Sequence, residues 1–144
     1  MKTKRFAPNE IASVDDISFC QKEYSQFKYG NYSISKKYGK ELFQYFMEEL
    51  INNIETESLI IYSSPYAYLP TASYHMTQCF VDEMIENRQR LGSIKKIKFG
   101  KINRNHSYIE NYGAMNAEER YNLIKNDTYA LAEIPEENAT LLFL

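Results

Sequence analysis

Hydroxyl-bearing and cationic residues lie in two segments of this sequence where they could bind an anion. Ser63 and Ser64 follow an apolar run, and Thr71 directly precedes a segment with helical spacing. Hydroxyls, backbone N–H groups and the N-terminus of a helix together favour a negatively charged group. Residues between Ser63 and Thr71 include no Lys or Arg, so positive charge would have to come from Lys101 and Arg104. A guanidinium binds two oxygens at once, which makes Arg104 the best candidate for contacting a phosphate.

Tyrosines lie close to both segments and could stack on a base or a ribose. They are Tyr66, Tyr68, Tyr108 and Tyr112. Each of them could instead be half-buried packing, and Lys101 and Arg104 could instead be solvated charges, as we expect for Lys98. The sequence has no spacing typical of a metal-ligand cluster, a glycine-rich phosphate loop or a nucleophile with its base. We therefore assign no metal ligand.

The elements expected to position these residues are two strands joined by a helix. Residues 59–62 form a short apolar run closed by two serines and a proline, which predicts a buried strand. Residues 94–102 are strand-like again. Between them, Thr71 as N-cap and Gly92 as stop bound a helix. Its apolar positions are Met76, Cys79, Phe80, Met84 and Ile85.

A strand–helix–strand unit of this kind makes the two strands parallel neighbours in one sheet. In open parallel sheets, ligands bind beyond the carboxyl ends of the strands. Residues 63–71 occupy that place and also lead into the helix N-terminus. We therefore expect the binding site to begin there.

A long helix is expected before this unit. Residues 1–23 show little periodicity and predict an irregular lead-in, and Gly30 with Asn31 marks a turn. A helix then continues to about residue 54, because apolar residues recur with helical spacing. This apolar face consists of Ile34, Tyr38, Leu42, Tyr45, Phe46 and Leu50.

The remainder of the chain predicts a loop followed by short elements. Residues 104–113 are polar and lack a period, which indicates a long surface loop of the kind that is often functional. Asn116 and Glu119 resemble a capping box, so a short helix should follow to about residue 126. We then expect a brief strand, a turn and a fully buried strand at residues 128–131, 135–138 and 139–144.

Length and composition fit a single globular domain over residues 1–144. The strand–helix–strand unit makes it an α/β domain with a mainly parallel sheet and flanking helices. We divide it into an N-terminal part, residues 1–57, and a core part, residues 58–144. The net charge of −2 argues against a protein that holds nucleic acid by general electrostatics. No secretory signal or membrane-length apolar run is present, and two cysteines fit a reducing compartment, so we expect a cytoplasmic protein without membrane contact.

Taken together, four stretches resemble the type I phosphoribosyltransferase fold, and within it a bacterial group of phosphoribosyltransferase-like proteins. The likeness covers residues 24–144, and its stretches are residues 24–30 with 37–42, 63–72, 108–113 with 117–120, and 140–144. The family signature is an apolar strand followed by two acidic residues and a loop that wraps the ribose 5-phosphate. Residues 141–144 look like that strand, and the sequence ends where the acidic pair would begin.

The resemblance implies transfer of phosphoribosyl from phosphoribosyl pyrophosphate to a nitrogen acceptor such as a nucleobase, with Mg²⁺ assisting. By position, residues 63–71 look like the loop that cradles pyrophosphate, with Ser63, Ser64, Tyr66 and Thr71 as candidate contacts. Residues 104–113, with Tyr108 and Tyr112, look like a mobile loop that closes over the site. Lys101 and Arg104 would then carry the catalytic charge.

Three interpretations of function remain open at this stage. The first is a phosphoribosyltransferase whose complete form continues past Leu144, so that this chain alone is inactive and its fold incomplete at the C-terminus. The second is a non-catalytic module of the same fold that binds a nucleotide or a protein. The third is a fragment with no function of its own, which we expect to be marginally stable or oligomeric because a bare sheet edge favours association, with a second copy or a partner covering the C-terminal strand.

Overall fold

The structure is a computed structural model, and it describes residues 21–64, 72–104, 114–125, 129–135 and 138–144. The helices are α2 (Gln21–Lys28), α3 (Tyr32–Tyr45), α4 (Ala72–Glu86) and α5 (Ala117–Ile124). The strands are β1 (Ser58–Tyr62), β2 (Lys96–Gly100), β3 (Ile102–Arg104), β4 (Tyr129–Leu131) and β5 (Ala139–Phe143). A π-helical turn (Phe46–Leu50) and two short 3₁₀ turns (Ile51–Asn53 and Arg88–Arg90) complete the described elements.

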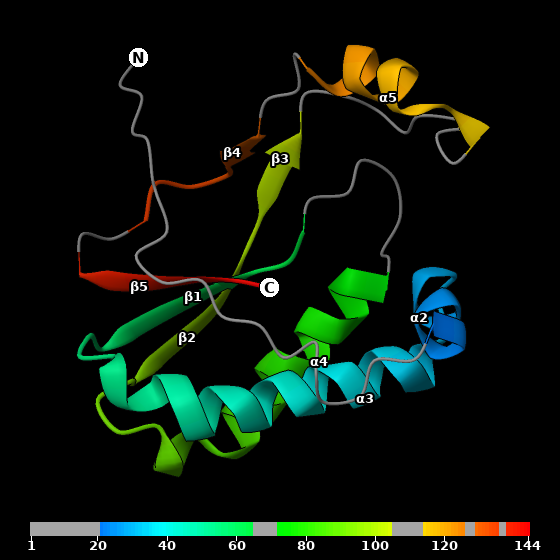
Figure 1. The fold of residues 1–144 in the computed structure, drawn as a ribbon. Coiled ribbons are helices and arrows are strands. Elements are labelled where there is room, and N and C mark those ends of the chain that lie inside the picture. Colours follow the sequence, from blue (N-terminus) through cyan, green and yellow to red (C-terminus); the bar gives the residue numbers. More distant parts are fainter. Residues whose placement is uncertain (1–20, 65–71, 105–113, 126–128, 136–137) are drawn as a thin grey trace.

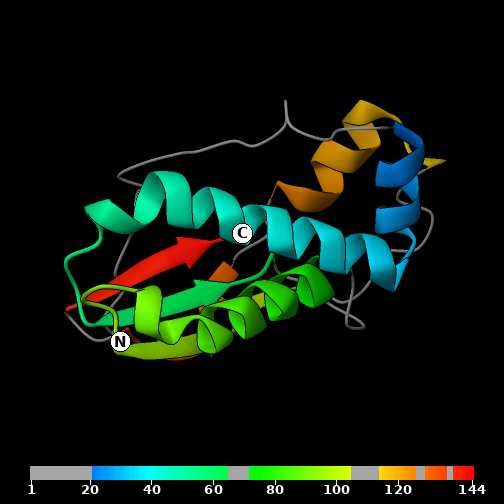
Figure 2. The ribbon, with the colours of Figure 1, turned by 90° about the horizontal axis from the view of Figure 1, so that it is seen from below.

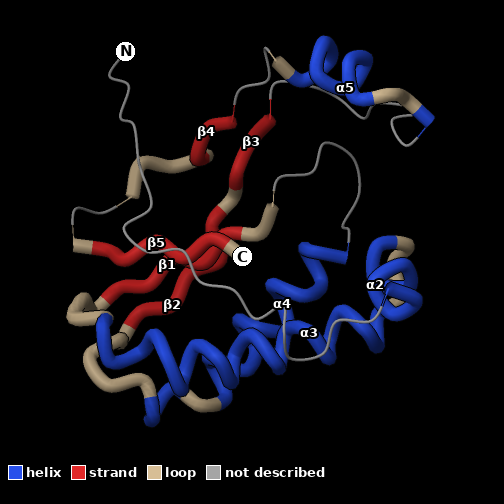
Figure 3. Tube along the Cα trace, viewed as in Figure 1, coloured by secondary structure: helices blue, strands red, loops and turns tan. Residues whose placement is uncertain are grey.

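Three parallel strands form the main sheet, in the order β2-β1-β5 (Figures 1 and 3). In β1, Tyr62 pairs with Gly100 of β2 on one side and with Phe143 of β5 on the other. Helix α4 connects β1 to β2, which confirms the strand–helix–strand unit and the α/β class. Strands β3 and β4 pair antiparallel as a separate two-stranded ribbon, with Arg104 opposite Tyr129.

Helices α3 and α4 lie side by side against one face of this sheet (Figure 2). Leu59 and Ile61 of β1 point toward them and are fully buried. Phe80 of α4 makes edge-to-face contacts with Phe43 and Phe46. The described core therefore forms between the two helices and one sheet face, because alternate residues of β1 point to that side.

The predicted apolar face of the first long helix is right in part, because Phe46 is buried and Leu42 and Leu50 pack against the core. The buried face of α3 itself is shifted toward Ser35, Gly39 and Phe43, whereas Ile34 and Tyr38 are only partly buried. Gly39 causes this shift, because it lets α3 approach the backbone of α4 closely. The π-helical turn after Tyr45 then changes the helical phase, so a single period does not fit the whole segment.

The helix of the strand–helix–strand unit also ends earlier than predicted. It stops at Glu86 rather than near Gly92, because the Asn87 side chain donates a hydrogen bond of 2.8 Å to the Glu83 carbonyl and competes with continuation of the helix. Gly92, with φ of 62°, lies in the following turn instead. Ile85 is 47 % exposed, so its place on the apolar face was wrong, whereas Cys79, Phe80 and Met84 are buried as predicted.

Other boundaries differ in smaller ways. Residues 21–28 form α2, a helix that the sequence analysis did not predict, and its first residues lie in the expected irregular lead-in over residues 1–23. The strand expected over residues 94–102 divides at Lys101 into β2 and β3. Strand β5 is confirmed, but it is not fully buried, since Phe143 at the edge of the described sheet is 53 % exposed. The short helix and the brief strand are confirmed as α5 and β4.

The capping box is confirmed at the N-terminus of α5. The Asn116 side chain accepts a hydrogen bond of 2.9 Å from the Glu119 amide, and it donates one of 3.0 Å to the Glu119 carboxylate. In the part of the chain that the structure describes, every helix is too short or too polar to cross a lipid bilayer.

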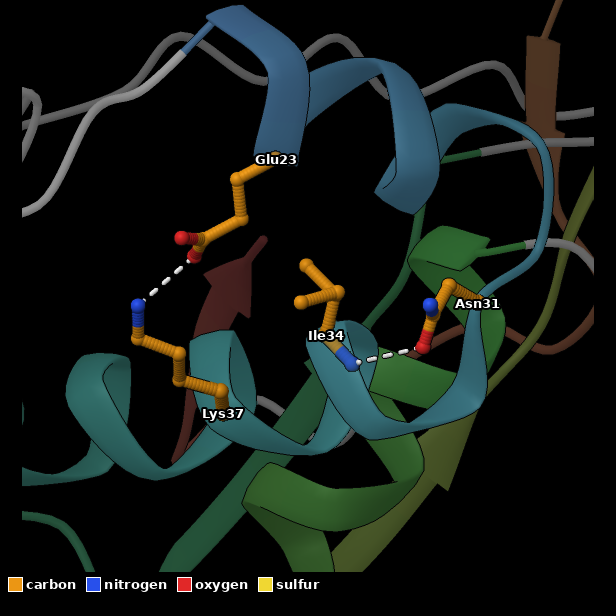
Figure 4. Close-up of polar contacts among 4 residues, drawn as sticks. All are labelled: Glu23, Asn31, Ile34 and Lys37. Carbon is orange, nitrogen blue, oxygen red and sulfur yellow. Dashed lines mark hydrogen bonds and ion pairs between the residues drawn. The ribbon is translucent and has the colours of Figure 1, made fainter.

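Asn31 caps the N-terminus of α3 by accepting a hydrogen bond of 3.3 Å from the Ile34 amide (Figure 4). Nearby, Glu23 of α2 accepts a hydrogen bond of 2.7 Å from the ammonium group of Lys37 of α3. We expect Asn31→Ala to lower the free energy of unfolding by about 1 kcal/mol, because an amide at the helix end loses its acceptor. Urea denaturation followed by circular dichroism measures this.

Asn31→Ser is the matched control, since serine can accept the same bond. It should retain most of the stability. Equal losses in both variants would show that the cap contributes nothing.

Candidate functional site

The three parallel strands end together at one edge of the sheet (Figure 3). Their last residues are neighbours, because Tyr62 pairs with both Gly100 and Phe143. The next residues are Ser63, Lys101 and Leu144. The Leu144 amide donates a hydrogen bond of 2.9 Å to the Tyr62 carbonyl, so β5 stays paired to the very end of β1.

Ser63 and Ser64 lie at this carboxyl edge, where the sequence analysis placed them. The Ser64 hydroxyl donates to the Leu144 carbonyl at 3.3 Å, and the Ser63 hydroxyl donates to the Ser64 carbonyl at 3.4 Å. Both bonds are long for a hydroxyl donor. Because Ser64 is exposed and Ser63 is partly exposed, an incoming anion can compete with these carbonyls for the two protons.

Lys101 and Arg104 are separated by the division between β2 and β3. Lys101 is exposed and follows Gly100 directly, so its backbone lies one residue beyond the pairing that aligns Tyr62 with Gly100. Arg104 ends β3 three residues later, roughly 10 Å further along an extended chain. The Lys101 carbonyl accepts a hydrogen bond of 2.9 Å from the Ala132 amide, which fixes the start of the ribbon. Of Lys101 and Arg104, only Lys101 therefore has its backbone at the carboxyl edge of the main sheet.

The remaining predicted contacts fall outside the described residues. These are Tyr66, Thr71, Tyr108 and Tyr112, and their roles stay predictions. Thr71 directly precedes Ala72, the first residue of α4, so the chain between Ser64 and α4 connects the sheet edge to the start of this helix.

A second concave feature lies on the sheet face that α3 and α4 do not cover. It is a cavity of about 320 Å³ between this face and residues 132–135. Side chains of Ile60 and Tyr62 contribute from β1, and those of Lys96 and Lys98 from β2. Lys101 and Glu133 also line it, and Glu133 forms an ion pair with Lys98.

Tyr62 is almost completely buried beside this cavity, with 3 % of its surface exposed. Its ring stacks on Phe143 with 4.9 Å between centroids, and it covers Gly100, where a Cβ atom would come within 2.2 Å of the ring. Burial raises the pKa of the Tyr62 hydroxyl, an effect that Lys98 opposes and Glu133 increases. The hydroxyl therefore stays protonated at neutral pH and can donate a hydrogen bond.

The sequence analysis missed this cavity and interpreted Lys98 as a solvated charge. One signal was available, because Lys96 and Lys98 alternate with Ile97 and Phe99, which join the core. That alternation places both lysines on the opposite sheet face. The pairing with Glu133 had no signal, since it depends on where residues 132–135 cross the sheet.

Comparison with known proteins gives one finding. A family model described as PRTase ComF-like matches residues 3–144. No curated protein and no solved structure matches significantly.

Proposed function

Because the chain belongs to the PRTase ComF-like family and is phosphoribosyltransferase-like, we propose that it binds phosphoribosyl pyrophosphate at the carboxyl edge of its parallel sheet. In a complete enzyme, the reaction would transfer phosphoribosyl to a nitrogen acceptor such as a nucleobase. The acceptor nitrogen would form a bond to the anomeric carbon of the ribose, and the carbon–oxygen bond to pyrophosphate would break.

One observation carries this proposal most directly. Strand β1 ends with Tyr62, Ser63 and Ser64 follow at the sheet edge, and the chain then enters α4 at Ala72. A strand that leads through a short connection into a helix places hydroxyls and helix N–H groups at the same edge. These groups suit a pyrophosphate, whose oxygens accept hydrogen bonds.

Lys101 supplies positive charge at this edge, and Arg104 follows in β3. An ammonium beside the leaving pyrophosphate would stabilise the charge that develops as the bond breaks. Arg104, with its planar donor group, would contact phosphate oxygens further along the ribbon. Tyr66, Thr71, Tyr108 and Tyr112 complete the proposed set of substrate contacts.

Magnesium is the cofactor that we expect from the resemblance. The described residues that directly follow β1, β2 and β5 offer hydroxyl, amide and ammonium groups but no carboxylate side chain, and the described residues hold no cluster of metal ligands. They do not fit a protein-bound magnesium ion, which proteins usually hold through one or two carboxylates. We therefore assign it no ligand and derive no step through it.

A second candidate function is binding of a nucleotide or a protein without catalysis. Among the described residues that directly follow the three strands, Lys101 is the one cationic side chain, which is little charge for stabilising a leaving pyrophosphate. This observation favours an inactive 144-residue chain, and a partner or a second copy could then cover the β5 edge.

The test is calorimetric titration of the chain with phosphoribosyl pyrophosphate, with and without magnesium. We expect binding, and we expect Lys101→Met to weaken it about tenfold or more, since a hydrogen bond to a charged group contributes roughly 1.5–3 kcal/mol. Lys95→Met is the matched control, because Lys95 pairs with Glu57 before β2 begins.

Pyrophosphate release measured in the same samples separates the two candidates. Release with a nucleobase present supports the transferase, whereas binding without release supports the non-catalytic module. Absence of any binding to the unaltered chain would contradict the proposed binding of phosphoribosyl pyrophosphate and leave the second candidate, binding of another nucleotide or of a protein.

A further inference from the structure

The described residues that line the cavity on the open face of the sheet are mainly basic where they are charged. They include three lysines, Lys96, Lys98 and Lys101, and one acidic residue, Glu133, so these four described residues carry a formal net charge of +2. Lys96 and Lys98 are two residues apart on one strand, so both project from the same face at a separation of about 7 Å. A group that carries two negative charges would balance this set.

The cavity already contains one anion, because the Glu133 carboxylate forms an ion pair with Lys98. The Lys98 side chain is 56 % exposed and the Glu133 side chain 72 %, so both partners remain largely in water. Exposed ion pairs contribute little to stability. A stronger anion can therefore replace the Glu133 carboxylate at Lys98 without disturbing the sheet.

Tyr62 adds an uncharged donor beside the same lysines. Its hydroxyl is buried, yet it has no hydrogen-bond partner among the residues that the structure describes. A buried hydroxyl without a partner is unfavourable, so such groups in native proteins are usually matched by a ligand or water. Tyr62, Lys98 and Glu133 all line the same cavity.

The volume of the cavity and the residues that line it limit the class of ligand that it can bind. The volume of about 320 Å³ lies at the lower end of the range for small-molecule pockets, roughly 300–1,000 Å³. Ile60 forms part of the floor, and Ile134 and Pro135 contribute from the crossing segment. The cavity thus combines one charged region with a small apolar surface.

We propose that this cavity is a second binding site, distinct from the carboxyl edge, for a small phosphate monoester. The phosphate would replace the Glu133 carboxylate at Lys98 and contact Lys96 and the Tyr62 hydroxyl, while Lys101 borders both sites. A phosphate monoester carries a charge of about −1.5 to −2 at neutral pH, which matches the charge of the cavity. This inference is independent of the proposed transferase function.

The experiment is titration with inorganic phosphate and, separately, with ribose 5-phosphate, followed by calorimetry at low salt. Lys98→Met should weaken binding of both about tenfold, because a charged donor is lost. Glu133→Gln should strengthen binding roughly threefold, because the internal competitor loses its charge. Opposite effects from two partners of one ion pair would not arise from a general loss of structure.

Two controls locate the site. Lys95→Met removes a positive charge just outside the cavity and should leave both affinities unchanged, as should Lys36→Met on the exposed face of α3. Unchanged phosphate affinity in both Lys98→Met and Glu133→Gln would overturn the proposal, and so would absence of phosphate binding to the unaltered chain. Neither result depends on whether phosphoribosyl pyrophosphate binds at the edge.

Discussion

Replacing Gly39 with leucine is expected to lower the free energy of unfolding by about 3 kcal/mol, because α3 and α4 approach each other closely at this position. A Cβ atom on Gly39 would lie 2.6 Å from the Met76 carbonyl oxygen and 2.8 Å from the Cβ atom of Cys79. One of these is a backbone atom inside a helix, so it cannot move aside as a flexible side chain would. The two helices would have to separate.

A gain in helix propensity of about 1 kcal/mol on replacing glycine opposes this loss and is smaller. Lys36→Leu places the same side chain on an exposed position of α3 and should change stability little, because lysine and leucine have similar helix propensities. Chemical denaturation followed by circular dichroism gives both values. If the two leucine variants are equally stable, the close approach of α3 to α4 is wrong. Gly39→Ala should fall between them.

Some of the fold follows from local sequence, and β1 shows why. Residues 59–62 are all apolar, because the central strand of the sheet is buried on both faces, and such a run between polar residues predicts a strand. The parallel arrangement then follows from the helix between β1 and β2. These features depend on residues that are near one another in the chain.

The buried face of α3 shows what local sequence does not contain. Its periodic apolar residues predicted a stripe that begins at Ile34 and Tyr38, but these two are only partly buried, and helix packing buries Gly39 and Phe43. A glycine adds nothing to a hydrophobic pattern, although its missing side chain is what permits the contact. The decisive information was the shape of α4, which lies more than thirty residues away in the chain.

The candidate sites divide in the same way. The adjacency of Ser63 and Lys101 could be predicted, because residues that follow parallel strands meet at one edge of a sheet. The cavity could not be predicted. Lys98 lies beside Glu133 only because the chain, after β3, α5 and β4, crosses back over the open face of the sheet. The alternation of Lys96 and Lys98 with apolar residues in β2 indicates which face of the sheet carries the positive charges. It does not identify Glu133 as their partner.

Phe80→Ala is expected to produce the largest loss of stability, about 3–5 kcal/mol, and to lower Tm by roughly 10 °C. The ring is 1 % exposed and lies between Phe43 and Phe46, with centroid distances of 6.2 Å and 5.7 Å. Truncation leaves a cavity between α3 and α4 and removes both edge-to-face contacts, which contribute beyond their buried area. Differential scanning calorimetry measures the change.

Ile85→Ala is the informative comparison, because the sequence pattern placed Ile85 and Phe80 on the same apolar face of this helix. The structure leaves Ile85 47 % exposed, so its truncation should cost less than about 1 kcal/mol. Phe80→Leu should be intermediate, since leucine fills part of the space. If Phe80→Ala and Ile85→Ala lower the stability by comparable amounts, α4 must be rotated differently about its own axis. Ser63 and Ser64, which precede this helix, would then need a new position relative to the sheet.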